Sequence, residues 1–263
     1  MKELSKRKND HNILNVKQRR VLDLLYRFRF ITALLLSQYK GTSLSTVKAS
    51  LALLEKQSYI AKRYDKTYKL AGKGAEYYLA PQGLKELRSS QDTDEDILHS
   101  MYKNSHLSSA FIERCLQSVQ TYIKLDKDYP ERFNIYTRVE MTHVDGFIDP
   151  TPDLYLESTK ENKLNYFLEL QAGNQLFVLR KRVAAIVDHY DSGEWERGDY
   201  PDTLVVCDSP QAEKAIQEYL AQLLESTGVD DEIRFLTTSQ KALQNYEKNI
   251  WTNPLAHEKM VSL

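Results

Sequence analysis

Two acidic side chains in the C-terminal half of the chain have a spacing that suits a divalent cation. Asp153 follows Pro152, and Glu169 comes after fifteen intervening residues, in the run Glu169-Leu170-Gln171. Mg²⁺ binds rigidly held carboxylate oxygens, and such an ion can activate a water molecule and stabilise a scissile phosphate. The pattern therefore predicts Mg²⁺ or Mn²⁺ ligands at Asp153 and Glu169 that could serve phosphodiester hydrolysis.

The strand period can bring these side chains together. Residues 153–157 and 166–171 have the composition of neighbouring strands joined by a polar hairpin loop. Successive side chains of a strand alternate between faces, so Glu169 and Gln171 share one face. Asp153, at the start of the other strand, can then meet them across the hairpin.

The wider element order is that of a mixed sheet flanked by helices. The patterns predict a long helix, three strands, a helix, a buried strand, a further helix and a last strand. These elements cover residues 97–124, 133–139, 153–157, 166–171, 174–190, 203–207, 211–225 and 233–237. With the Pro-Asp and Glu-Leu-Gln runs inside it, this order resembles the restriction-endonuclease-like PD-(D/E)xK fold.

That resemblance implies roles for further residues. Glu113, on the long helix, occupies a place where such folds often supply another metal-binding carboxylate. The family usually has lysine at the position of Gln171, where it stabilises the phosphate and orients the attacking water. Lys181, in a basic triplet on the next helix, is the candidate for the missing charge, with Gln171 as a positioning group. The plainer alternative is that Asp153 is an ordinary turn residue and that Glu169 and Gln171 are a half-buried hydrogen-bonded pair. The basic triplet around Lys181 would then be a solvated helix face.

Charge is distributed unevenly along the 263 residues. The chain has 36 Lys+Arg and 37 Asp+Glu, a net charge of −1, which alone argues against a nucleic-acid binder. Residues 1–90, however, contain 19 basic and 7 acidic side chains, a net +12, and residues 91–263 contain 17 and 30, a net −13. Such asymmetry favours nucleic acid as the partner of the basic part.

The basic part has the pattern of a small helical domain with a hairpin. Apolar periodicity predicts three helices, a turn before the third helix, and then two strands. The helices span residues 16–26, 31–39 and from a Ser43 or Ser45 cap to about 58, and the hairpin has strands 59–64 and 68–70 with a turn at 65–67. This order resembles the winged helix-turn-helix superfamily over residues 14–88.

The resemblance implies double-stranded DNA as the partner. The N-terminal side of the third helix would enter the major groove, and the hairpin would lie along phosphates. The groove-facing candidates are Ser43, Ser45, Thr46 and Lys48, and the phosphate-contacting candidates are Lys62, Arg63, Lys66 and Lys69. The alternatives are a solvated basic face and a protein-interaction module.

The two halves together resemble the plasmid replication-relaxation family and the related MobC-type mobilisation relaxases, over nearly the whole chain to about Thr237. The resemblance rests on residues 27–32, 68–70, 106–107, 152–153, 167–173 and 201–206. It implies a DNA-binding protein at an origin of transfer or replication, acting as a metal-dependent nicking enzyme, with a second copy or relaxosome proteins as partners. The alternative is a non-catalytic accessory protein or transcriptional repressor whose nuclease-like fold only serves assembly.

The sequence thus predicts an α+β chain in three parts. They are a winged helix-turn-helix domain (1–90), a restriction-endonuclease-like α/β domain with a mixed sheet (91–240) and a tail with a helix and an irregular end (241–263). Cys115 and Cys207 are the only cysteines and have no metal-ligand spacing, which favours a reducing compartment. No apolar run approaches the ~18 residues of a membrane span, so a cytoplasmic protein without a membrane partner is expected.

Overall fold

The computed structural model describes residues 14–89, 93–160, 164–229, 232–245, 250–256 and 259–260. Within these ranges the chain is α+β, as predicted, with a three-stranded antiparallel sheet among the N-terminal helices and a seven-stranded mixed sheet in the C-terminal part. No helix in these ranges is both long and apolar enough to cross a bilayer.

Local capping signals explain the first three helices. The N-terminal elements are α1 (Val16–Phe28), β1 (Ile31–Thr32), α2 (Ala33–Lys40) and α3 (Leu44–Lys56). Thr32 caps α2, Gly41 ends it in the left-handed conformation, and the Ser43 hydroxyl accepts from the Thr46 N–H to cap α3. The predicted helix order, the glycine turn and the Ser43 cap are therefore confirmed.

The hairpin that follows differs from its prediction. Asp65 caps a short helix, α4 (Lys66–Leu70), by accepting from two backbone N–H groups. The strand that pairs with β2 (Ile60–Arg63) is β3 (Glu76–Leu79), not residues 68–70. The favoured two-residue hairpin turns contain glycine at positive φ, and residues 65–67 have no glycine, whereas aspartate before helix-forming residues starts a helical turn. The predicted turn and returning strand were wrong for this reason.

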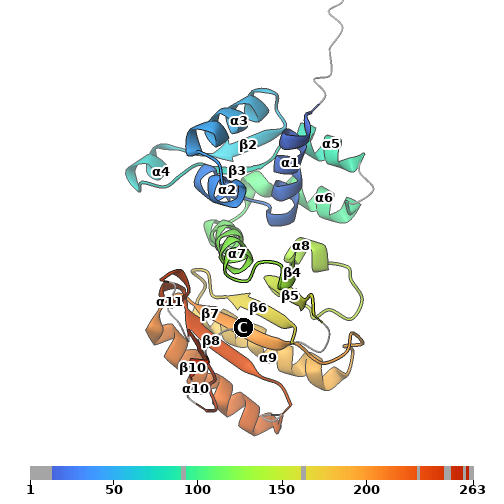
Figure 1. Cartoon of the computed structure of the whole chain (residues 1–263), viewed down its shortest axis with the longest axis vertical. Helices are drawn as coiled ribbons and strands as arrows, with labels where there is room; N and C mark the ends of the chain where they lie inside the picture. Colours follow the sequence, from blue (N-terminus) through green and yellow to red (C-terminus); the bar gives the residue numbers. More distant parts are fainter. Residues whose placement is uncertain are drawn as a thin grey trace, which may run out of the picture.

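The first hydrophobic core continues past residue 90. After α5 (Pro81–Arg88), it includes Ile97, Leu98 and Met101 of α6 (Glu95–Met101). It also includes Val119 of α7 (Ser109–Asp128), whereas Leu125 of α7 belongs to the core under the large sheet. Figure 1 shows α7 between the N-terminal elements and that sheet. α7 thus contributes buried residues to both hydrophobic cores.

The single long helix predicted from residue 97 is instead two helices. The short 3-10 turn η1 (Asn104–His106) separates α6 from α7, and the Ser108 hydroxyl caps α7 by accepting from the Phe111 N–H. Asn104 is fully buried and accepts from the side chain of Arg29. A cap and a buried polar turn end the helix where apolar periodicity alone would continue it.

The large sheet follows the predicted element order. Its elements are β4 (Phe133–Thr137), α8 (Arg138–Met141), β5 (Leu154–Ser158), β6 (Tyr166–Leu170), α9 (Leu176–Ser192), β7 (Asp202–Cys207), α10 (Pro210–Thr227), β8 (Phe235–Ser239), α11 (Gln240–Gln244), β9 (Trp251–Thr252) and β10 (Lys259–Met260). The strand order is β10-β9-β8-β7-β6-β5-β4, and the β6–β7–β8 pairs are parallel. In the tail, α11 is the predicted helix, and β9 and β10 extend the sheet antiparallel where irregular chain was expected. The last three residues of the predicted irregular end, 261–263, lie outside the described residues.

Both faces of the sheet are covered. Leu204 and Val206 of β7 join one core, whereas Val205 and Cys207 join a second core with α9 and α10. Figure 1 shows α9 and α10 together on the face opposite α7. The apolar run of β7 is therefore a strand buried on both faces, as its composition predicts.

One glycine is required by close packing. A Cβ at Gly83 in α5 would lie 2.2 Å from the Tyr59 carbonyl oxygen. We expect Gly83→Ala to lower the free energy of unfolding by about 1–3 kcal/mol, because the backbone must move apart. Urea unfolding measures this, with Lys85→Ala on the exposed side of the same helix as the control. Equal stability of the two variants would contradict the packing.

Candidate functional site

The structure brings Asp153 and Glu169 together through a guanidinium group. Arg114 on α7 donates from Nε to Asp153 Oδ1 at 2.6 Å and from Nη2 to Asp153 Oδ2 at 2.7 Å. The same Nη2 donates to Glu169 Oε2 at 2.9 Å. The predicted meeting of the two carboxylates across β5 and β6 is therefore correct, but an arginine lies between them.

Two further arginines complete this charged cluster. Arg182 on α9 donates from Nε and Nη2 to the two oxygens of Glu169 at 2.5 and 2.6 Å. Arg138, the first residue of α8, donates to Asp153 Oδ1 at 2.9 Å. We call Arg114, Arg138, Arg182, Asp153 and Glu169 the arginine–carboxylate cluster. Its members come from three helices, from β6 and from the residue that precedes β5.

The cluster is buried, and burial sets its electrostatics. Asp153 is 3 % exposed and Glu169 is 1 % exposed. Burial raises the pKa of Asp153, but the charges of Arg114 and Arg138 outweigh it and hold that pKa below its ordinary value. For Glu169, burial and the Asp153 charge raise the pKa more than Arg182 lowers it. Paired and hydrogen-bonded charges of this kind are how a protein tolerates carboxylates in its interior.

These residues do not fit Mg²⁺ or Mn²⁺. Every oxygen of Asp153 and Glu169 accepts a hydrogen bond from an arginine, and Asp153 Oδ2 also accepts from the Leu170 N–H at 2.8 Å. A divalent cation needs those lone pairs, and the arginine charges would repel it at short range. The observed geometry is that of a structural ion-pair network.

The remaining predicted catalytic residues lie outside the cluster. Glu113 is exposed on α7, whereas the next residue, Arg114, is buried. Lys181 is exposed and lies over the Phe177 ring at 5.9 Å. Gln171 is buried, but its amide donates to the Asn174 carbonyl and accepts from the Asp208 N–H, so it ties the end of β6 to the end of β7.

Helix phase could have identified the arginines that the spacing of acidic residues did not reveal. In α9, Arg182 shares the buried stripe of Leu179, Val183 and Ile186, whereas its neighbour Lys181 does not. In α7, Arg114 lies seven residues before the buried Thr121. A basic residue on an apolar helical stripe must find an acidic partner when the stripe is covered. That signal points to Arg182 and Arg114.

The groove-facing candidates of α3 are all on its surface. Ser43, Ser45, Thr46 and Lys48 are exposed, and the Ser43 hydroxyl also contacts the hydroxyls of Ser45 and Thr46. The buried side of the helix consists of Val47, Leu51 and Leu54. The N-terminal turn of α3 therefore presents small hydroxyl side chains and one lysine to solvent.

The hairpin candidates divide into two groups. Lys62 donates to Glu55 at 2.8 Å, and Arg63 donates to the Leu107 carbonyl at 2.9 Å, so both side chains have partners within the chain. Lys66 and Lys69 are exposed on α4. Figure 1 shows α4 projecting from the rest of the N-terminal elements. The outer lysines are thus the ones placed for contact with another molecule.

A basic groove lies beside the start of α3. Its volume is about 630 Å³, and its lining includes Lys17 and Arg20 of α1, Lys40 of α2 and Thr46 of α3. Burial and the charges of Arg20 and Lys17 lower the pKa of Lys40, as expected where several cations line one groove. The sequence pattern does not single these residues out, because α1 and α2 contribute them separately.

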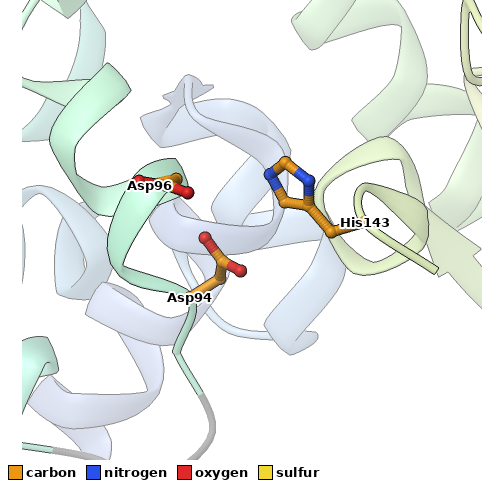
Figure 2. A group of neighbouring side chains, drawn as sticks. All are labelled: Asp94, Asp96 and His143. Atoms are coloured by element: carbon orange, nitrogen blue, oxygen red, sulfur yellow. The ribbon is translucent and has the colours of Figure 1, made fainter.

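Among the described residues, one set of side chains has the donor types and proximity to hold a metal ion. Donor atoms of Asp94, Asp96 and His143 lie within 4.8 Å of one another, and Figure 2 shows them facing a common space. All three are exposed, and the Asp94 carboxylate already caps α6 by accepting from the Ile97 N–H. Exposed groups of this kind are common without an ion.

Comparisons of the chain with protein-family models, with curated proteins and with solved structures found no match.

Proposed function

We propose that this protein binds double-stranded DNA through its N-terminal part and that its C-terminal α/β part serves assembly, not phosphodiester cleavage. The observation that carries the proposal is the exposed N-terminal turn of α3 beside the basic groove of Lys17, Arg20 and Lys40. The order of helices and strands around α3 resembles that of winged helix-turn-helix domains, in which such a turn enters the major groove.

The charge pattern supports the same surface. Lysines and arginines that neutralise phosphates give DNA binding most of its non-specific affinity. The groove supplies three cations on one side of α3, and Lys66 and Lys69 on α4 supply two more. In this proposal Lys62 and Arg63 do not contact phosphates, because their side chains bind Glu55 and the Leu107 carbonyl within the chain.

The arginine–carboxylate cluster favours the accessory role of the C-terminal part. A PD-(D/E)xK nuclease needs its two carboxylates open to metal, whereas here they are saturated by guanidinium groups. The resemblance to plasmid replication-relaxation and mobilisation proteins makes an origin of transfer or replication the first DNA to test. A second copy of the chain and relaxosome proteins are the corresponding partners.

DNA binding is tested by removing charges at the groove. We expect Arg20→Gln with Lys40→Gln and Lys48→Gln to weaken binding to a labelled duplex roughly 10–100-fold at low salt. The slope of log affinity against log salt should fall by about 0.9 for each phosphate that the variant no longer neutralises. Fluorescence anisotropy at several salt concentrations measures both quantities.

The control removes the same charge elsewhere. Lys160→Gln with Lys214→Gln and Lys241→Gln changes three exposed lysines of the C-terminal part, and it should leave affinity and salt slope as in the wild type. If the Arg20, Lys40 and Lys48 variant binds like the wild type at every salt concentration, α3 and its groove are not the DNA surface.

The accessory role has its own test. Supercoiled plasmid carrying the candidate origin is incubated with the protein and Mg²⁺ or Mn²⁺, beside an Asp153→Ala variant. We expect both proteins to shift the DNA in a gel and neither to nick it. Nicking by the wild type that Asp153→Ala abolishes would overturn the non-catalytic assignment while leaving DNA binding intact.

A further inference from the structure

A small cavity lies where the N-terminal elements meet the large sheet. Its volume is about 200 Å³, and side chains from α1, α6, α7 and α8 line it. Its lining includes Arg27 and Arg29 from the end of α1, Arg114 from α7, Arg138 from α8, and Asp153. Four arginines and a single carboxylate in the lining make this cavity unlike an ordinary packing gap.

The side chains around the cavity carry an excess of positive charge. Arg27 pairs with Glu140 at 2.9 Å, and the arginine–carboxylate cluster adds three arginines against Asp153 and Glu169. With Arg29, this makes five arginines against three carboxylates, two positive charges more than negative. An excess of that size in a partly desolvated place is costly unless an anion balances it.

Arg29 is the clearest uncompensated charge. Its guanidinium donates to Asn104 Oδ1 at 2.8 Å and to the Ser100 carbonyl at 3.3 Å, and it lies over the Phe111 ring at 5.1 Å. In the part of the chain that the structure describes, it has no carboxylate partner. Burial lowers the pKa of Arg29, which is the expected effect on a cation that neutral groups solvate only in part.

Arg138 is compensated only in part. It shares Asp153 Oδ1 with Arg114, which binds Asp153 with two hydrogen bonds. Burial lowers the pKa of Arg138, and the nearby charges of Arg114 and Arg182 act in the same direction against Asp153. Its side chain is 34 % exposed, so part of it contacts solvent.

We propose that this cavity binds a phosphate-class oxyanion between Arg29 and Arg138. A phosphate dianion carries the two negative charges that the surrounding side chains lack. Guanidinium groups match phosphate oxygens with paired N–H donors, which favours phosphate over a halide. The cavity is smaller than those that hold drug-sized ligands, so it suits a phosphate group and little more. This site shares the lining residue Arg27 with the groove beside α3, but the proposal does not depend on DNA binding there.

The test is thermal unfolding of the full chain in phosphate-free buffer, with inorganic phosphate titrated against sodium chloride at equal ionic strength. We expect a saturable rise in Tm, roughly 5 °C when phosphate is about 100-fold above its Kd. Arg29→Gln and Arg138→Gln should each remove the saturable rise. Arg132→Gln, which replaces an arginine outside the cavity that lies over the Tyr129 and Phe133 rings, should retain it.

The proposal is also tested by a variant that adds a carboxylate to the cavity and removes no arginine, so that loss of the fold is not mistaken for loss of binding. Ser118 lines the cavity one helical turn after Arg114. We expect Ser118→Asp to raise Tm in phosphate-free buffer and to abolish the response to phosphate. No saturable response in the wild type, an equal response in the arginine variants, or a Ser118→Asp protein that still responds to phosphate would each overturn the proposal.

The source of the phosphate is decided by two further titrations. A duplex with 5′-phosphate ends is compared with the same duplex without them, each as a competitor of inorganic phosphate in calorimetry. Competition that requires the 5′-phosphate assigns the cavity to a nucleic-acid end. Binding of inorganic phosphate that neither duplex affects assigns it to free phosphate or a small phosphomonoester. Both outcomes support an oxyanion site.

Discussion

Replacement of Arg114 by methionine is expected to lower the free energy of unfolding by about 3–5 kcal/mol. Arg114 is the only cluster member that bonds to both Asp153 and Glu169. Methionine fills much of the same volume, so the destabilisation comes from two carboxylates left facing one another in the interior, with no shared countercharge. Removing one member of a buried ion pair is costly because the other member stays desolvated.

The matched control is the preceding residue. Glu113→Gln changes a side chain that is exposed on the same helix, and its stability should match that of the wild type. Urea unfolding followed by circular dichroism compares the variants. If Asp153 and Glu169 instead formed a metal site, Arg114→Met would free their oxygens for an ion. Mg²⁺ would then stabilise the variant, and the loss of stability would not be seen. Gain of Mg²⁺-dependent stability in the wild type would therefore contradict the structural role of the cluster.

Asp153→Asn is expected to have the second largest effect, and its effect should depend on pH. At neutral pH we expect a decrease of about 3 kcal/mol in the free energy of unfolding, because Arg138 is left without its carboxylate partner and Arg114 keeps only Glu169. The pKa of Asp153 in the folded protein lies below its ordinary value of 3.8. The folded state therefore binds this proton less readily than the unfolded state does.

The sign of the pH effect follows. The contribution of Asp153 to stability is fully present above its unfolded pKa and is lost as pH falls through the folded pKa. The difference between wild type and Asp153→Asn should thus be largest from about pH 5 upward and should shrink below about pH 4. Because the Asp153 charge also raises the pKa of Glu169, the same comparison is repeated in a Glu169→Gln background, where Asp153 is the only one of the two carboxylates that titrates. Urea unfolding between pH 3 and 6 measures it, and a difference that grows on acidification would contradict the assignment.

The sequence predicted the elements well wherever a local signal specifies them. Thr32, Gly41 and Ser43 fix the ends of α2 and α3 by capping, and the apolar run of β7 specifies a strand covered on both faces. Local signals failed where two local structures compete. Asp65 was interpreted as part of a turn, but it begins a helix, and the apolar stripe of residues 97–124 concealed the break at Ser108.

The local pattern of residues already specifies which side chains point inward. Strand alternation sets Glu169 apart from Leu168 and Leu170, and helix phase places Arg182 on the buried stripe of α9. The groups that these side chains meet are set by the packing of whole elements. The partners of Asp153 and Glu169 come from α7, α8 and α9, and the packing of those helices around the start of β5 and the end of β6 brings guanidinium groups to the carboxylates. Charge pairing depends on distances between elements remote in the chain, and no local pattern encodes those distances.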